Sequence, residues 1–133
     1  GTSGSDFSVT TRSDGGYATG SDRRRKKNIT TIENALSTVK QLTGKRFQTV
    51  NSTNEVQEHV SKNGYKLGFI AQEVEDIIPE TVIYHEDEDD GTDNYNSAYA
   101  MDYGSVVALL VNAIKEQDTT IQDLKSRIET LEG

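Results

Sequence analysis

The longest regular pattern of apolar and polar residues occupies residues 104–133. Apolar side chains recur there at alternating spacings of three and four, which is the heptad pattern of a coiled coil. After Gln117, the single polar position, only the two heptad core positions are apolar, and so narrow a stripe needs partner helices. Before it, Val106, Leu109, Val111 and Ala113 widen the apolar surface, so we expect this half also to pack on a core. The seam consists of Val107, Leu110, Ile114, Gln117, Ile121, Leu124, Ile128 and Leu131.

The residue types along this seam bear on how many helices associate. Isoleucine occupies three positions of one core set, at Ile114, Ile121 and Ile128, and leucine occupies most of the other set. β-Branched residues at the first core position, with leucine at the second, favour parallel two-stranded coils. The pattern therefore predicts self-association of this helix, but it does not by itself predict three chains.

A second helical pattern covers residues 28–44. Apolar residues recur there every three or four positions, Asn28 can cap the start, and Gly44 marks the end. We therefore expect one amphipathic helix over this segment. Its apolar residues are Ile29, Ile32, Leu36, Val39 and Leu42.

Shorter patterns elsewhere predict strands joined by turns. Residues 13–16 form one turn, an acidic turn joins the last two strands into a hairpin, and residues 72–78 form a short helix that Pro79 ends. The predicted strands are residues 7–11, 45–51, 65–71, 81–85 and 95–103.

Composition narrows the possible partners. Only 32% of the 133 residues are apolar, and the net charge is −8, from 22 acidic and 14 basic residues. A thin apolar core favours oligomerisation, and the acidic excess argues against nucleic acid or an anionic membrane surface as partner. No apolar run reaches the ~20 residues of a membrane span, and the first residues lack the form of a signal peptide. The absence of cysteine excludes disulfides and thiolate metal sites.

Most candidate sites lack support in the sequence. His59 and His85 are the only histidines, and neither has an accompanying nucleophile pattern, so we expect surface residues. The acidic stretch 87–94 offers oxygen donors, but it departs from a calcium-binding loop at both diagnostic positions. We therefore expect no metal site and no cofactor.

The basic run at residues 23–27, close behind Ser21, allows more than one interpretation. A serine can act as a nucleophile without histidine if an uncharged lysine takes its proton, and neighbouring cations favour that uncharged form. Lys26 or Lys27 could serve as this base. Taken alone, however, a capped and solvated helix start explains the run better. A nucleic-acid-binding arm is a weaker interpretation, because the run is short and lacks interleaved aromatic residues.

Three longer motifs occur in order along the chain: "SDRRRKKNI", "GFIAQEVEDIIPE" and "MDYGSVVALLVNAIKE", the last running into the coiled coil. Together they resemble the C-terminal intramolecular chaperone domain of phage tail spikes, tail fibres, neck appendage proteins and endosialidases. This is the peptidase S74 family, which also occurs in a eukaryotic membrane-bound transcription factor. The resemblance covers residues 21–131.

The resemblance implies a role for each residue of the first motif. The family's opening, Ser-Asp-x-Arg-x-Lys, matches Ser21 to Lys26 and implies that Ser21 is the nucleophile and Lys26 its general base. The implied activity is that of a self-cleaving serine endopeptidase, a Ser–Lys dyad that acts once in cis and cuts the Gly20–Ser21 bond. Two earlier Ser-Asp pairs, at residues 5–6 and 13–14, lack the following Arg and Lys and are weaker candidates. Residues expected to support the motif are Asp22, Arg24, Lys27 (the alternative base), Gln72 and Glu73.

The resemblance also implies the fold and the assembly. We expect an α+β fold with an N-terminal helix, a small antiparallel sheet with a protruding hairpin arm, and a long C-terminal helix in a trimeric bundle. Residues 1–20 would be a leader or the end of an upstream fibre segment, residues 21–103 an α+β chaperone core, and residues 104–133 the coiled-coil helix. Residues 51–64 or 85–96 could form the arm.

The expected function follows from this assembly. The homotrimer would drive trimerisation and folding of the upstream β-rich fibre or spike of the same polypeptide. This would take place in the host cytoplasm during virion assembly, and cleavage would then release the domain from the virion tail. The alternative is a non-catalytic trimerisation or adhesin-tip module that stays attached to the fibre.

Overall fold

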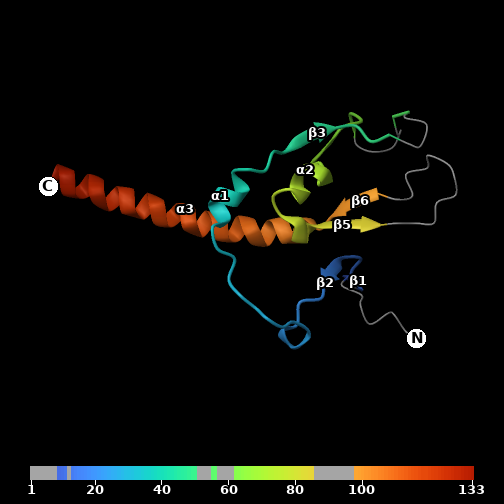
Figure 1. The fold of residues 1–133 in the computed structure, drawn as a ribbon, viewed down its shortest axis with the longest axis horizontal. Coiled ribbons are helices and arrows are strands. Elements are labelled where there is room, and N and C mark those ends of the chain that lie inside the picture. The colour runs from blue at the N-terminus through green and yellow to red at the C-terminus, as the bar shows by residue number, and fades with distance from the viewer. Residues whose placement is uncertain (1–8, 12, 51–54, 57–61, 86–97) are drawn as a thin grey trace. The chain divides into compact units, whose positions relative to one another are not determined.

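The structure, a computed structural model, describes residues 9–11, 13–50, 55–56, 62–85 and 98–133. The chain divides into two compact units, residues 1–31 and residues 32–133. In chain order the elements are β1 (Val9–Thr11), β2 (Tyr17–Thr19), the 3-10 turn η2 (Arg23–Arg25), α1 (Ala35–Val39), β3 (Lys45–Phe47), β4 (Lys66–Gly68), α2 (Ala71–Glu75), the 3-10 turn η3 (Pro79–Thr81), β5 (Val82–His85), β6 (Ala98–Met101) and α3 (Tyr103–Glu132) (Figure 1).

The first unit contains a small hairpin followed by η2. Strands β1 and β2 pair antiparallel, with Val9 opposite Thr19. Gly15 has a φ of 86°, a left-handed conformation that glycine adopts without strain, and the Asp14 carboxylate accepts the Gly16 N–H at 3.0 Å. The expected strand and turn near the N-terminus are therefore confirmed over the described residues, whereas β2 is not among the predicted strands.

The core of the second unit lies between α1 and the first half of α3. Ala35 is fully buried, and Leu109 and Ala113 of α3 are 5% and 3% exposed. Figure 1 shows α1 alongside α3. The expectation that the first half of the long helix packs on a core is therefore confirmed, except at Val111, which is exposed. Partly buried residues around this core are Leu36, Val39, Leu42 and Ile78.

The first helix is much shorter than the sequence pattern predicted. It begins at Ala35 rather than near Asn28, and Ile29 and Ile32 are exposed. Two features explain the difference. The segment before the helix is rich in β-branched residues, which lose side-chain freedom in helices. Asn28 and Asn34 also adopt left-handed backbone conformations, with φ of 57° and 55°, and these interrupt a right-handed helix.

A side chain from α3, rather than a local residue, caps the start of α1. Asn34 occupies the N-cap position but makes no side-chain cap hydrogen bond. Instead the Glu116 carboxylate accepts the backbone N–H of Ala35 at 2.7 Å and that of Leu36 at 3.2 Å. Asn112, one turn earlier on α3, donates its side-chain N–H to the Ile32 carbonyl at 3.1 Å. Three hydrogen bonds therefore tie residues 32–36 to α3.

Two short antiparallel sheets complete the second unit. In one, β3 pairs with β4 and places Lys45 opposite Gly68. In the other, β5 pairs with β6, from Val82 opposite Met101 to His85 opposite Ala98. This pairing confirms the expected hairpin, whose connecting turn lies outside the described residues. The short helix α2 precedes Pro79 as expected.

Gly68 permits a close contact between β4 and the start of α3. A Cβ on Gly68 would lie 2.6 Å from the Tyr103 hydroxyl oxygen, which no side chain could tolerate without a shift. That hydroxyl accepts the Phe69 N–H at 3.3 Å. The glycine therefore lets the hydroxyl of Tyr103 reach the backbone of the strand.

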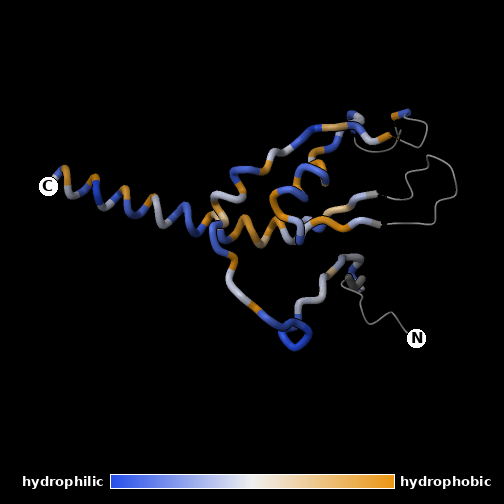
Figure 2. The backbone as a smooth tube through the Cα atoms, viewed as in Figure 1, coloured by the Kyte–Doolittle hydropathy of each residue, from blue (hydrophilic) through white to orange (hydrophobic). Residues whose placement is uncertain are grey.

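Helix α3 confirms the predicted C-terminal helix. Asp102 caps its start by accepting the Gly104 N–H at 2.9 Å. Figure 2 shows apolar residues recurring at regular intervals in its second half. With three two-stranded sheets and this helix, the described structure is α+β, as the sequence predicted.

Candidate active site

The basic run folds into a single 3-10 turn that Asp22 caps. Asp22 has an extended backbone and accepts the Arg24 N–H at 2.8 Å through its side chain. Backbone hydrogen bonds join Arg25 N–H to the Asp22 carbonyl at 3.0 Å and Lys26 N–H to the Arg23 carbonyl at 3.1 Å. After this turn the chain becomes extended at Lys26, with φ of −123° and ψ of 149°. The run is therefore one turn, not the start of a longer helix.

Arg24 reinforces the turn through its side chain. Its guanidinium Nη2 lies 2.8 Å from Asp22 Oδ2, and its Nε donates to Oδ1 at 3.1 Å. This charged pair lowers the pKa of Asp22 from its ordinary value, mainly through the side-chain hydrogen bond with Arg24 and then through the backbone one. The same side-chain contact raises the pKa of Arg24. Both groups are exposed, so solvent screens the attraction, and its main effect is geometric.

The folded turn brings Ser21 and Lys26 together. Lys26 Nζ lies 2.7 Å from Ser21 Oγ, within hydrogen-bond distance. In an α-helix two residues five apart would lie about 140° apart around the axis. A tight turn followed by extended backbone brings the two side chains to the same place. A charged lysine donates to the hydroxyl in this geometry, and an uncharged one can accept the hydroxyl proton.

The remaining residues expected to support the motif lie in different places. Lys27 is exposed and follows directly after the turn. Gln72 and Glu73 belong to α2 in the second unit, where Glu73 forms an ion pair of 3.6 Å with Lys45. Val74 on the same helix is 2% exposed, so the face of α2 that carries Val74 packs into the unit.

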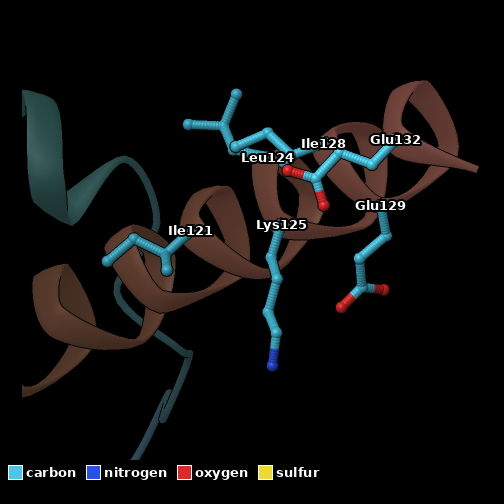
Figure 3. A pocket seen from close by; sticks show the side chains of 6 residues that line it. All are labelled: Ile121, Leu124, Lys125, Ile128, Glu129 and Glu132. Carbon is cyan, nitrogen blue, oxygen red and sulfur yellow. The ribbon is translucent and has the colours of Figure 1, made fainter.

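The seam of α3 is exposed along its length. Val107, Ile114 and Ile121 are 58%, 63% and 53% exposed. Near the C-terminus an open groove is lined by Ile121, Leu124, Lys125, Ile128, Glu129 and Glu132. Figure 3 shows Lys125 and Glu129 extending to one side of this groove, away from Leu124.

The sequence predictions also concern metal binding, membrane-spanning segments, the two histidines and the acidic stretch. Among the described residues, no group of three or more His, Cys, Asp or Glu side chains could hold a metal ion. Within the same residues, no helix combines the length and apolarity needed to cross a membrane. His59 and the acidic stretch 87–94 lie outside the described residues, and His85 belongs to β5.

The contact of Asn112 and Glu116 with the start of α1 is not predictable from the sequence pattern. Both residues belong to α3, where the heptad pattern assigns a role only to the apolar positions. Their hydrogen-bond partners lie 80 or more residues earlier in the chain. No local motif signals such a pairing. An unusual N-terminus for the first helix, with asparagine in a left-handed conformation, becomes visible only in the folded chain.

A serine hydroxyl within hydrogen-bond distance of a lysine amine, in a turn that local side chains hold, provides the two side chains that a Ser–Lys dyad requires. Comparison with known families bears on the same segment. Residues 21–83, somewhat less than half of the chain, match the model of the peptidase S74 family, which is described as chaperone of endosialidase. The resemblance found in the sequence is therefore confirmed for residues 21–83.

The chain also resembles two curated phage proteins. It is 29% identical over 110 residues to the long tail fiber protein Gp37 of Enterobacteria phage K3, covering 81% of this chain and 8% of that protein. It is likewise 29% identical over 110 residues to the long tail fiber protein Gp37 of Enterobacteria phage T2, covering 81% of this chain and 7% of that protein. The chain therefore spans less than a tenth of the length of these relatives.

Proposed function

We propose that this chain is a self-cleaving chaperone segment of a phage tail fibre or spike. It forms a homotrimer through α3, holds the preceding part of the same polypeptide while that part folds, and then cuts the Gly20–Ser21 bond once in cis. The observation that carries the proposal is the 2.7 Å separation of Lys26 Nζ and Ser21 Oγ, at the start of the segment that matches the family.

The proposed reaction uses these two side chains in turn. Uncharged Lys26 takes the proton of Ser21 Oγ, and the oxygen attacks the carbonyl carbon of Gly20. The Gly20–Ser21 C–N bond breaks, the proton passes to the released amine of Ser21, and the Gly20 acyl group remains on Oγ as an ester. Water then hydrolyses the ester, which leaves a carboxylate on Gly20 and restores the serine hydroxyl.

The exposed seam of α3 supports the proposed assembly. Apolar seam residues such as Leu124 and Ile128 stay about half exposed in a single chain, and association of copies would remove them from water. Intertwined β-rich fibres have many contacts between distant residues, so they fold slowly. A helix bundle forms quickly and keeps the chains at high effective concentration while the slower part folds.

The names of the relatives support a proposal for the setting of the protein. Their names describe long tail fibres of phages, so we place this chain in a virion component that is assembled in the host cytoplasm. The proposed partners are two further copies of the chain and the β-rich fibre that precedes it in the same polypeptide. Cleavage would release the chaperone from the mature tail.

The proposal is tested by substitution in the natural protein that contains these residues. The unmodified protein should yield two fragments, produced by a cut between Gly20 and Ser21. Ser21→Ala and Lys26→Ala should each leave one uncut chain that still assembles into trimers. Lys26→Arg should also be uncut, because arginine keeps the positive charge but does not release its proton. Lys27→Ala is the matched control and should be cut normally.

Two results would contradict these assignments. Cutting of Ser21→Ala at the same bond would exclude Ser21 as the nucleophile. If Lys27→Ala blocked cleavage while Lys26→Ala did not, the base would be Lys27. Light scattering provides the separate measurement of trimer mass.

A second candidate is a non-catalytic trimerisation module that stays attached to its fibre. The exposure of both Ser21 and Lys26 favours it, because water-filled surroundings weaken the electrostatic help on which catalysis depends. This module would assemble in the same way through α3. It would differ in one measurement, since the assembled protein would keep the Gly20–Ser21 bond intact.

A further inference from the structure

We infer that Asn112 and Glu116 are positioning residues that couple association along the α3 seam to residues 32–36, which follow the Ser21–Lys26 turn in the sequence after five intervening residues. The consequence of this coupling, that cleavage follows assembly, rests on the proposed function. Its structural part concerns only the second unit, where α3 carries both the exposed seam and the three hydrogen bonds to residues 32–36.

Glu116 supplies what the start of α1 lacks. The first N–H groups of any helix have no partner within the helix, and a nearby side chain or water must accept them. Asn34, at the N-cap, accepts none of them through its side chain. The two carboxylate oxygens of Glu116 instead accept the N–H groups of Ala35 and Leu36, and Ala35 is fully buried. A negative charge at this end also suits the helix dipole.

Asn112 extends the same contact backward along the chain. Its amide donates to the carbonyl of Ile32, three residues before α1 begins. Lys26 precedes Ile32 by only six positions in the sequence. Asn112 and Glu116 thus fix the first residues of the second unit, and in the sequence only residues 27–31 separate these from the turn that holds the serine and lysine.

The turns of α3 that make these contacts also form part of the seam. Leu109, Ala113 and Glu116 face α1, whereas Leu110 and Ile114 are 40% and 63% exposed. Because an α-helix has 3.6 residues per turn, Ala113 and Ile114 lie about 100° apart on adjacent faces. The same stretch of helix therefore serves two contacts at once.

Association on one face should therefore stabilise the contact on the other. A single helix with an uncovered apolar seam opens locally more often than one packed among partners. Each opening of the turns around residue 114 would misplace Asn112 and Glu116 and release residues 32–36. Packing of further copies against Ile114 would suppress these openings. Order in residues 32–36 would then increase with assembly, before any bond is cut.

Amide hydrogen exchange tests this coupling without depending on cleavage. The protein carries Ser21→Ala, so it stays intact, and the exchange rates of the Ala35 and Leu36 amides are followed. Ile114→Asp, which disrupts the seam, should raise both rates about tenfold, and Glu116→Gln should raise them similarly while the trimer persists. Glu33→Gln is the matched control, since it removes an exposed carboxylate from the same segment and should change neither rate.

The consequence for cleavage is tested with Ser21 restored. Glu116→Gln should slow cleavage about tenfold at unchanged trimer mass, because glutamine has one acceptor oxygen where the carboxylate has two and carries no negative charge. Asn112→Ala should slow it by a smaller factor, and Glu33→Gln should cleave at the normal rate.

Three outcomes would overturn the inference. The first is normal cleavage of a trimeric Glu116→Gln protein. The second is insensitivity of the Ala35 and Leu36 amides to Ile114→Asp. The third is a Glu116→Gln protein that no longer forms trimers, since Glu116 would then be a folding residue. If the unmodified protein is never cut while the exchange rates behave as expected, the proposed function fails and the coupling stands.

Discussion

Replacement of Ile121 by alanine separates association from folding within one chain. Ile121 belongs to the second half of α3, beyond the described contacts with α1, and 53% of its surface is exposed in a single chain. Complete burial of an isoleucine side chain stabilises by about 1.5–3 kcal/mol, so burial of the remaining half contributes roughly 1 kcal/mol. Each chain of a trimer loses this contribution. The substitution should therefore weaken association by about 3 kcal/mol per trimer, or roughly 100-fold in the association constant.

The assay is thermal and chemical unfolding at several protein concentrations. Unfolding of an associated protein shifts with concentration, because dilution favours the separate chains. The unmodified protein should show this shift, and Ile121→Ala should reach the behaviour of separate chains at a higher concentration. Analytical ultracentrifugation provides the association constant directly. Gln122→Ala is the matched control, since Gln122 is exposed on the same turn but lies outside the seam.

The reasoning would be refuted by a melting temperature that does not vary over a 100-fold range of concentration. It would also be refuted if Gln122→Ala weakened association as much as Ile121→Ala. Either result would mean that the apolar stripe of α3 is not the surface through which the chains associate.

Three further predictions concern single chains. Leu109→Ala should lower the free energy of unfolding by about 2–4 kcal/mol at every protein concentration, measured by denaturant titration, because Leu109 is buried against α1 rather than in the seam. Gly68→Ala should displace the Tyr103 hydroxyl and speed exchange of the Phe69 amide. Gly44→Ala should not, since a Cβ added there would meet no atom within 4 Å apart from its chain neighbours. Pairing with Arg24 lowers the pKa of Asp22 from its ordinary value of 3.8, so the ionised carboxylate stabilises the turn above that pH. This stabilisation is lost as the pH falls through the lowered pKa. NMR contacts between Ser21 and Lys26 should therefore weaken at such acidic pH and stay constant near neutral pH.

The sequence predicted α3 well, because the heptad pattern is local and repeats over the whole helix. It predicted the hairpin of β5 and β6 for a similar reason, since alternation in two nearby segments identifies paired strands. It misplaced the start of α1, since helical spacing at Ile29 and Ile32 outweighed the β-branched residues around them. The position that does begin the helix depends on Glu116, which lies far along the chain.

The candidate site shows a different limit. The residues alone allow Ser21 to pair with Lys26 or Lys27, and the choice of Lys26 comes from the family resemblance, because five-residue spacing alone does not bring two side chains together in a helix. Their contact depends on Asp22, which caps a 3-10 turn, and on the extended backbone of Lys26. Asp22 and Arg24 could be named from the motif, but their joint role in folding the turn follows only from the hydrogen bonds between them.

The measurement that tests the central claim most directly is mass spectrometry of the products formed in the presence of hydroxylamine. Attack by Ser21 Oγ leaves the Gly20 acyl group as an ester, and hydroxylamine captures such an ester as a hydroxamate. The account predicts a cut between Gly20 and Ser21, with the hydroxamate on Gly20 and a free amine on Ser21. An uncut chain after assembly, a cut at another bond, or a Gly20 carboxylate that saturating hydroxylamine never replaces would contradict it.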